Sequence, residues 1–533
     1  MHRILIADPL DPAGVEILQR SGSEVHELAT EERPRLGELI ASFDALVVRS
    51  MTRVDGDLLR AGRRLKVVGR AGIGVDNIDV ATATELGILV VNAPTANLLS
   101  ATEHTFALLL ALVRNVPAAD AALKAGRWDR QRFVGSELQG KTLGVVGFGR
   151  IGQRVAARGQ AFEMEVIAYD PYLEPGAARR LEVELVPLEE LLARADVVTL
   201  HVPLTGETRG LLNADRLAAM KDGAVLVNCA RGGVVDEEAL LAALAAGRLA
   251  GAALDVFAEE PPRNLELVRH PRVVATPHIG AQTREAQERI ATETARMVLA
   301  GLDDSLAVSA VNLPFASTGS RGEPYLDLGE RLGALASGLL GGGAHRLQVD
   351  LWGMEEGLAL PVTVAALKGA LTPFLGEGVN YVNAERVADS RGIEVVRASH
   401  HRAGEYPHLV GVTLEGGGRQ VELAGTLFGA EDPRVVRFEG YRLEFRPAGR
   451  LLVLCNRDVP GVVGKVGTLL GEAGVNIAEI HLARPARTRA GGDGDALAVL
   501  RLDQQPSAEV VRRLAGLAEV SRVQVVELPE ATS

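Results

Sequence analysis

The sequence contains very little cysteine, since its 533 residues include only Cys229 and Cys455. Two cysteines build no disulfide framework, and this scarcity predicts a reducing, cytoplasmic location. The opening "MHRILIADP" predicts a strand, so no signal peptide is expected. The longest apolar run, "FALLLALV" at 106–113, is far shorter than a membrane span, and no membrane partner is predicted.

Positive charge is also in short supply. The chain carries 57 Lys and Arg against 69 Asp and Glu, a net charge of −12. A nucleic-acid partner would require a basic face, so none is predicted. The net charge does not exclude a small anionic substrate, because a local arginine cluster can oppose the overall charge. A hydrophobic content of 47% is ordinary for a globular protein, and the length predicts roughly three to four domains.

Two series of short apolar segments alternate with helical patterns, the first up to about residue 97 and the second over 98–282. This alternation is typical of parallel sheets covered by helices. We therefore predict an α/β fold with two doubly wound, Rossmann-like domains and a cleft between them. A helical stretch follows, and 283–311 is assigned to the first domain, which is then discontinuous (1–97 and 283–311).

The second half of the chain has a different texture. Residues 312–449 are rich in glycine and predict an intervening α+β domain without a catalytic constellation. Residues 450–533 read as strand, helix, strand, strand, helix, strand, which is the ferredoxin-like βαββαβ plan. The segment 485–495 predicts a mobile hairpin loop between two of these strands.

A glycine-rich motif predicts the cofactor. In "GVVGFGRIG", Gly147, Gly149 and Gly152 have G-x-G-x-x-G spacing between an apolar strand and a helical pattern. The next strand ends in Asp170, at about the offset of a ribose-binding acid. A plain tight turn is the alternative, but strand, glycines, helix and acid together favour NAD. A carboxylate there would repel the extra phosphate of NADP.

Arg231, Glu260 and His278 each follow a predicted strand of the same domain. Ligands of an open α/β sheet bind outside the carboxyl ends of its strands, so these groups are expected to converge on the nicotinamide. A histidine suits removal of a hydroxyl proton, a neighbouring carboxylate orients it, and an arginine grips a carboxylate. Taken alone, each of these three residues could instead be an ordinary surface residue. His104 and His201 are alternative candidates for the base. We interpret His104 as buried on a helix that begins with a Ser100–Glu103 capping box, and His201 as a supporting residue.

The motifs "GRAGIGVDNID", "GFGRIG", "NCARGG", "DVFAEEPP" and "TPHIGAQT" resemble the D-isomer-specific 2-hydroxyacid dehydrogenases, and the resemblance covers essentially the whole chain. It implies that Arg231, Glu260 and His278 form the catalytic trio, that 98–282 binds NAD and that the first domain binds substrate. No metal site is predicted. The resemblance also implies further cofactor contacts at Arg150, Ile151, Val202, Cys229, Ala230, Arg231, Asp255, His278, Ile279, Gly280 and Ala281. The implied substrate contacts are Arg49, Arg70, Asn97 and, from a neighbouring subunit, Arg130.

The terminal segment "NRDVPGVVGKVGTLLGEAGVNI" resembles an ACT domain, a small amino-acid-sensing module. The resemblance implies that L-serine binds where two such domains meet, with Asn456, Asp458 and Asn476 as polar ligands. A purely oligomerising domain is the alternative. Residues 312–449 resemble the intervening domain of the same family, and the resemblance implies a domain that binds anions and links subunits.

The resemblance implies NAD-dependent oxidation of 3-phospho-D-glycerate to 3-phosphohydroxypyruvate, the first step of L-serine biosynthesis, by a homodimer or homotetramer. One alternative is a reductase of another 2-hydroxyacid, such as glyoxylate or hydroxypyruvate. A different class of protein is a non-enzymatic NAD-sensing regulator on the same fold. The sensing tail favours the biosynthetic enzyme.

Overall fold

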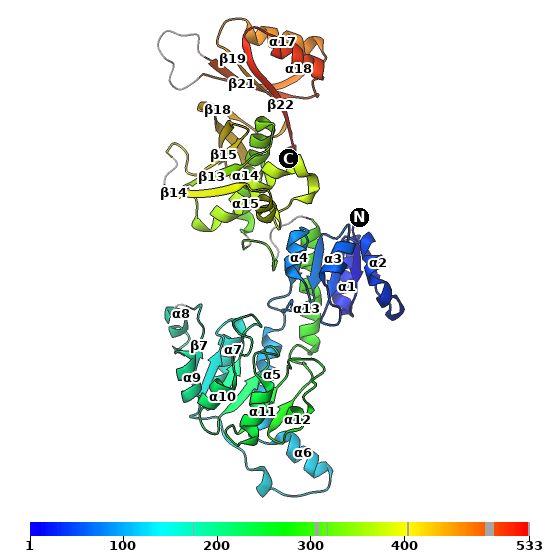
Figure 1. Ribbon diagram of the computed structural model, residues 1–533, viewed down its shortest axis with the longest axis vertical. Coiled ribbons are helices and arrows are strands. Elements are labelled where there is room, and N and C mark those ends of the chain that lie inside the picture. The colour runs from blue at the N-terminus through cyan, green and yellow to red at the C-terminus, as the bar shows by residue number, and fades with distance from the viewer. Residues whose placement is uncertain (174, 304–308, 317, 402–403, 485–494, 531–533) are drawn as a thin grey trace.

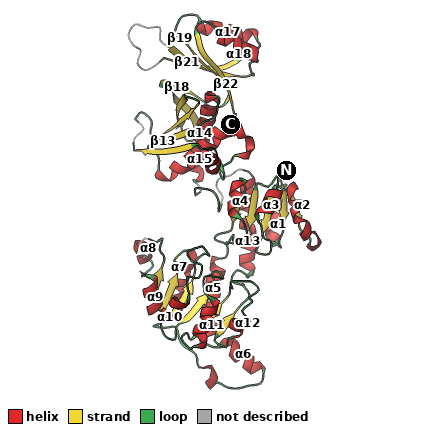
Figure 2. Cartoon of the chain, viewed as in Figure 1, coloured by secondary structure: helices red, strands yellow, loops and turns green. Residues whose placement is uncertain are grey.

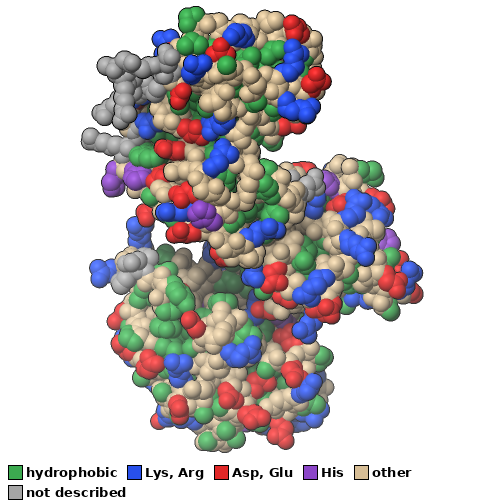
Figure 3. Space-filling view, turned by 45° about the horizontal axis from the view of Figure 1, so that its top comes forward, with side chains coloured by type: hydrophobic (Ala, Val, Ile, Leu, Met, Phe, Trp, Pro, Cys, Tyr) green, Lys and Arg blue, Asp and Glu red, His purple; other side chains and the backbone are tan. Residues whose placement is uncertain are grey.

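The chain forms four bodies arranged in a row (Figure 1), each with its own sheet. The structure is a computed structural model that describes all residues except 174, 304–308, 317, 402–403, 485–494 and 531–533. Helices and strands are distributed over all four bodies (Figure 2). Acidic and basic side chains are intermixed on the face seen in Figure 3, in keeping with a moderate net charge of −12.

The first body is a parallel sheet of five strands in the order β2-β1-β3-β4-β5. All four residues of β3 are buried, which is why its sequence "ALVV" is an unbroken hydrophobic run. The strands are β1 Arg3–Ile6, β2 Glu24–Glu27, β3 Ala45–Val48, β4 Val67–Arg70 and β5 Leu89–Asn92. The covering helices are α1 Pro12–Arg20, α2 Leu36–Leu39, α3 Gly56–Ala61, α4 Val80–Glu85 and α13 Arg284–Leu302.

The second body is a parallel sheet of seven strands in the order β12-β11-β10-β9-β6-β7-β8. The chain order reverses beside β6, and this is the point where such sheets bind nucleotides. The strands are β6 Thr142–Val146, β7 Glu165–Tyr169, β8 Glu184–Leu185, β9 Val197–Leu200, β10 Val225–Asn228, β11 Gly251–Leu254 and β12 Val273–Ala275. The helices are α5 Leu98–Val113, α6 Val116–Lys124, α7 Arg150–Ala161, α8 Pro175–Arg179, α9 Leu188–Arg194, α10 Ala214–Ala219, α11 Glu237–Ala245 and α12 Leu265–Arg269.

Two segments join these bodies, one before α5 and one before α13. Helix α5 packs on α7 and β11 of the second body, whereas α13 packs on α1, β4 and β5 of the first. The hydroxyl of Thr283 caps α13 by accepting a hydrogen bond from the Ala286 N–H (3.2 Å). The first body therefore combines the start of the chain with α13. The exact domain boundaries stay a prediction.

The third body is a mixed sheet of six strands, β14-β13-β15-β16-β17-β18, packed against long helices. One segment, Glu356–Leu375, is long and apolar enough to cross a membrane by length and composition, but 56% of its most apolar window is buried. It contains α15, which packs along α14 as a core helix. The elements are α14 Gly319–Leu340, β13 Arg346–Trp352, α15 Ala359–Leu375, α16 Ala384–Ser390, β14 Glu394–His400, β15 Leu409–Gly416, β16 Arg419–Phe428, β17 Asp432–Phe438 and β18 Tyr441–Phe445.

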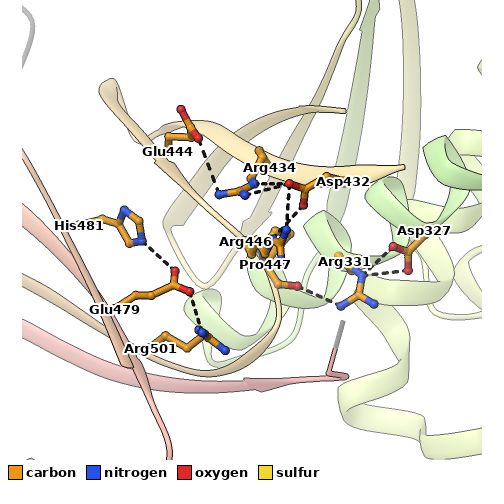
Figure 4. Close-up of polar contacts among 10 residues, drawn as sticks. All are labelled: Asp327, Arg331, Asp432, Arg434, Glu444, Arg446, Pro447, Glu479, His481 and Arg501. Atoms are coloured by element: carbon orange, nitrogen blue, oxygen red, sulfur yellow. Dashed lines mark hydrogen bonds and ion pairs between the residues drawn. The ribbon is translucent and has the colours of Figure 1, made fainter. Parts of the chain in front are cut away.

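The fourth body has the predicted βαββαβ order, with strands arranged β20-β21-β19-β22. Its elements are β19 Gly449–Arg457, α17 Val462–Glu472, β20 Ile477–Ala483, β21 Asp495–Leu502, α18 Ala508–Ala515 and β22 Val520–Leu528. Its junction with the third body combines a shared apolar core, which includes Leu451, Val499 and Val526, with the polar contacts of Arg331 (Figure 4). The guanidinium of Arg331, in a residue only 6% exposed, donates to the carbonyls of Pro447 (3.2 Å), Pro529 (2.9 Å) and Glu530 (3.2 Å).

The predicted fold class is confirmed, but local predictions differ from the structure. The capping box at Ser100–Glu103 is wrong, because α5 already begins at Leu98 and the Ser100 hydroxyl donates to the Gly280 carbonyl instead (2.7 Å). The predicted hairpin loop 485–495 lies outside the described residues except for Asp495, which begins β21.

Candidate active site

The glycine loop between β6 and α7 has the geometry of a dinucleotide cradle. Gly147 has φ +91°, and a Cβ there would lie 2.6 Å from the His201 carbonyl oxygen. At Gly152 a Cβ would lie 2.1 Å from the Gly147 carbonyl oxygen, so the helix can pack this close to the loop only without a side chain. At Gly149 no atom lies within 4 Å of that position. The space in front of the α7 N-terminus thus fits a pyrophosphate, and the loop fits NAD.

Asp170 lies at the end of β7, against this loop. Its Oδ2 accepts a hydrogen bond from the Phe148 N–H, and its Oδ1 accepts one from the Tyr172 N–H, both at 3.0 Å. Each carboxylate oxygen has further acceptor capacity for a ribose hydroxyl. The backbone bonds fix the carboxylate beside the glycine loop, where the adenosine ribose of a bound dinucleotide would lie. Val202, just after β9, lies beside the same loop.

His278 has a positive φ of 54°, and Asp255 explains how the loop holds it there. The Asp255 side chain is 1% exposed and accepts from the N–H groups of Ile279 and Gly280, both at 2.8 Å. Thr276 donates its hydroxyl to the same carboxylate (2.6 Å). Burial alone would raise the pKa of Asp255, but the hydrogen bonds from His104, Thr276 and Ile279 outweigh it and lower the pKa. The negative charge is therefore retained, and with it the shape of the loop.

His278 and Glu260 form a directly bonded pair, with His278 Nδ1 2.7 Å from Glu260 Oε2. An ionised carboxylate only accepts hydrogen bonds, so Nδ1 carries the proton and Nε2 of the neutral ring is free to accept one. Burial would raise the pKa of Glu260, but the hydrogen bond and charge of His278 and the Phe257 N–H lower it overall. Both side chains remain accessible, at 46% and 39% exposure, so a substrate can reach them.

Arg231 lies in the loop after β10, and Asn228 shapes that loop. The Asn228 amide donates to the Arg231 carbonyl (3.0 Å) and accepts from the Ala230 N–H (3.0 Å). The Arg231 guanidinium donates to the Ala230 carbonyl (2.7 Å) and to Asp76 of the first body (3.1 Å). Arg231 thus bridges the two α/β bodies and lies where a ligand between them would meet it.

Two arginines of the first body add to this positive charge. Burial, followed by repulsion from Arg231, lowers the pKa of Arg70 to about 10; Asp76 and Asp8 oppose the shift and Arg49 adds to it. The Arg70 Nε is buried without a hydrogen-bond partner among the described residues, and so is Asn97 Oδ1 at the start of α5. An anionic ligand would relieve the repulsion among Arg49, Arg70 and Arg231. This cluster fits a small, multiply charged anion.

The two competing histidines have other surroundings. Burial lowers the pKa of His201 to about 3, and its Nε2 lies 2.9 Å from the Thr199 hydroxyl, so it stays neutral. His104 is turned to Asp255, with its Nε2 3.2 Å from Oδ1. Burial raises the pKa of Cys229 to about 12, which makes it a neutral thiol in the cofactor-side loop. His201 and Cys229 therefore do not compete with His278 as a base near neutral pH, and the side chain of His104 is less accessible to a substrate (15% exposed) than that of His278 (46%).

The structure does not bring Arg130 to the cleft of its own chain. Arg130 is exposed and follows α6, and Figure 1 shows α6 at the end of the second body that points away from the first. The effector residues are also separated. Asn456 and Asp458 lie at the end of β19, whereas Asn476 precedes β20 at the opposite end of the sheet, because Ile477 and Arg450 both pair with Leu502. Asp458 is held by Arg484 (2.5 Å) and Asn476 by Asp503 (2.6 Å).

Several supporting residues were missed by the sequence reasoning. The buried Asp8 accepts from the N–H groups of Arg49 (2.7 Å) and Thr52 (3.1 Å), and the Asn77 amide donates to the Arg49 carbonyl (2.6 Å). These contacts hold the loop that carries Arg49. Their positions in the sequence could have indicated this role, because Asp8 and Asn228 both lie at the carboxyl ends of parallel strands, β1 and β10.

Comparisons with known proteins identify the domains of the chain. Family models match three parts of the chain: the NAD binding domain of D-isomer specific 2-hydroxyacid dehydrogenases at 106–280, the D-3-phosphoglycerate dehydrogenase intervening domain at 322–439, and the ACT domain at 449–519. Two solved structures share the α/β part: a glyoxylate reductase from Paecilomyes thermophila (31% identity, 58% of this chain and 98% of that one, TM-score 0.54) and a D-lactate dehydrogenase from Aquifex aeolicus complexed with NAD and lactic acid (32%, 57% and 96%, TM-score 0.52).

Fold and family models thus define the class: an NAD-dependent 2-hydroxyacid dehydrogenase. Three curated D-3-phosphoglycerate dehydrogenases align along the whole chain. They come from Archaeoglobus fulgidus (40% identity, 99% of this chain, 100% of that protein), Bacillus subtilis (38%, 99% and 100%) and Mycobacterium tuberculosis (42%, 98% and 99%). The chain belongs to the D-3-phosphoglycerate dehydrogenase family.

Proposed function

We propose that the protein oxidises 3-phospho-D-glycerate to 3-phosphohydroxypyruvate with NAD, the first step of L-serine biosynthesis. The observation that carries the proposal is full-length similarity to D-3-phosphoglycerate dehydrogenases at about 40% identity. The arginine cluster between the two α/β bodies supports it, since this substrate brings a carboxylate and a phosphate. A panel of 2-hydroxyacids followed by NADH absorbance tests it. A higher kcat/KM for glycolate or D-glycerate than for 3-phosphoglycerate would contradict it.

In the proposed mechanism, His278 Nε2 accepts the proton of the substrate hydroxyl. Glu260, 2.7 Å from Nδ1, stabilises the imidazolium that forms and fixes the ring orientation. Arg231 binds the carboxylate bidentately and polarises the developing carbonyl. NAD, when bound, supplies the hydride acceptor. Arg49, Arg70 and Asn97 hold the rest of the substrate, and the loop around Asp255 keeps His278 at its left-handed φ of 54°.

The cofactor role of Asp170 leads to a prediction. Asp170→Ala should raise the KM for NAD by roughly 10- to 100-fold, because a hydrogen bond to a charged group contributes about 1.5–3 kcal/mol. It should also reduce the discrimination against NADP, since the repelling carboxylate is gone. Initial rates with both cofactors give the ratio of the two kcat/KM values. Wild type that uses both cofactors equally would contradict the role of Asp170.

Regulation by L-serine would require two chains. In one chain the sheet register places Asn476 at one end of the edge strand β20 and Asp458, paired with Arg484, at the other. If two β20 strands pair antiparallel, Asn476 of each chain lies at the end of the shared sheet that carries Arg484 and Asp458 of the other. Ile480 (47% exposed) and Leu482 (50% exposed) on β20 support such a contact. The ammonium and carboxylate of serine would then bind at the shared edge.

The regulatory prediction concerns Asp458→Asn, which keeps the shape of the side chain. Coupling between sites is typically about 1–3 kcal/mol, so serine should change substrate affinity or turnover of wild type by about 5- to 150-fold. The variant should lose this response and keep its turnover without serine. A serine titration of initial rates, with calorimetry, measures both. Glu472→Gln, in an exposed ion pair on α17, is the matched control and should respond like wild type.

Two outcomes would contradict the sensor proposal: wild type that binds no serine, or Asp458→Asn with unchanged serine affinity. The third body contacts the first body directly, because Asn380 donates to the Gly87 carbonyl (2.7 Å) and Arg386 pairs with Glu85 (2.5 Å).

We also propose a cytoplasmic homodimer or homotetramer in which Arg130 serves the site of a neighbouring subunit. Exposed Trp128 (78%) and Val134 (80%) flank Arg130, and apolar side chains on an exposed segment are typical of an interface. Sedimentation of the full chain distinguishes the two oligomers. A monomer at micromolar concentration would contradict the subunit contact.

A further inference from the structure

A second group of arginines, distinct from Arg49, Arg70 and Arg231, lies at the connection between the two α/β bodies. Arg154 and Arg158 belong to α7 of the second body, and Arg289 belongs to α13 of the first. They line a pocket of about 290 Å³ together with Thr95, Ala96, Leu98 and Leu99, which form the connecting segment before and within α5. Figure 1 shows α13 extending from the first body toward the body that carries α5 and α7.

The charges of the three guanidinium groups are not balanced by ion pairs with the described residues. Within the described part of the chain, no carboxylate forms an ion pair with Arg154, Arg158 or Arg289. Arg154 and Arg158 are four residues apart on one helix face, and like charges at this spacing repel. One carboxylate contacts the lining of the pocket, since Glu293 accepts from the Thr95 hydroxyl at 3.1 and 3.2 Å.

Two of these side chains are already oriented by the backbone. Arg289 Nε donates to the Ala96 carbonyl (2.9 Å), and Arg158 Nη1 donates to the Arg154 carbonyl (3.2 Å). A guanidinium has five N–H donors, so each keeps several for a ligand. Part of the ordering that a bidentate oxyanion contact requires is therefore present before binding. Leu98 and the 44% exposed Leu99 add apolar surface beside the charges.

We propose that this pocket binds a small phosphate-bearing molecule, with its phosphate held by Arg154, Arg158 and Arg289. Arginine matches phosphate geometry with paired N–H donors, and the phosphate charge would cancel the repulsion among the three groups. The pocket volume is near the lower end of the range for small-molecule sites, which leaves room for a compact organic group against Leu98 and Leu99. Because the arginines come from both α/β bodies, binding is linked to their relative orientation.

Calorimetric titration of the full-length protein with inorganic phosphate, at constant ionic strength, tests the site. The cleft arginines also attract phosphate, so two double variants separate the sites. Arg49→Gln with Arg70→Gln weakens the cleft and should still bind phosphate. Arg154→Gln with Arg289→Gln should lose that second binding event or weaken it at least roughly tenfold. Arg269→Gln, at the exposed end of α12, is the matched control and should bind as wild type does.

Two results would overturn the proposal. One is unchanged phosphate binding in the Arg154→Gln, Arg289→Gln variant; the other is loss of all phosphate binding in the cleft variant. NAD binding by each variant reports that the fold is intact. If the double variant does not fold, the single variant Arg154→Gln at an exposed position gives the same test, with weaker binding expected and unchanged binding overturning the site. Neither result depends on catalytic activity, so a failure here leaves the proposed dehydrogenase function untouched.

Discussion

Replacing His278 should lower kcat by roughly 10²–10⁴-fold and leave NAD binding intact, because general acid–base catalysis contributes about that much. We expect this result for both His278→Asn and His278→Ala. Asn is the sharper variant, since His278 has φ 54° and Asn adopts the left-handed region more readily than Ala. The asparagine variant removes the base and adds less backbone strain. Steady-state rates with 3-phosphoglycerate, together with NADH titration by fluorescence, give both quantities.

The companion experiment to the His278 variants changes the carboxylate partner of His278, Glu260. Glu260→Gln keeps a hydrogen-bond acceptor near Nδ1 but removes the charge that stabilises the imidazolium. The pKa of Glu260 is lowered, so this carboxylate stays charged throughout the pH range in which the enzyme works. The acidic limb of the kcat/KM profile should therefore move to lower pH in Glu260→Gln, with a reduced maximum. Near-normal kcat in His278→Asn would refute the assignment of the base, whatever the profile of Glu260→Gln shows.

The sequence predicted the two α/β sheets well because their central strands are buried on both faces. Strands β3, β9 and β10 are buried at all four positions, and their sequences ALVV, VVTL and VLVN consist mostly of apolar residues. The edge strands β2 and β8 were not predicted, because they lack such buried apolar residues or are too short. β2 has the sequence "EVHE" with no buried residue, and β8 has only two residues, so neither carries a hydrophobic signal.

In the candidate site, the main residues could be predicted from the sequence, but the contacts that orient them could not. The glycine spacing and the residues Arg231, Glu260 and His278 follow strands, so their convergence could be predicted from the parallel sheet. The contacts that orient them join distant parts of the chain: Asp76 to Arg231, Ser100 to Gly280 and Asp8 to Arg49. No local pattern encodes such pairings. Ser100 illustrates how a local pattern can mislead. Its spacing to Glu103 matches a capping box, but its hydroxyl donates a hydrogen bond to a carbonyl 180 residues away.

Arg231→Gln should lower kcat/KM by roughly 10²–10³-fold, the usual effect of removing one donor to a developing oxyanion. Arg231→Lys should also lose much of the activity, since a lysine cannot replace a bidentate fork. An alternative role for Arg231 is only to join the two bodies through Asp76, 3.1 Å away. Asp76→Asn separates the two roles, because it removes that partner and keeps Arg231. If Arg231 binds substrate, Asp76→Asn should retain kcat/KM within a few fold; equal losses in Asp76→Asn and Arg231→Gln would show that the arginine serves the junction alone.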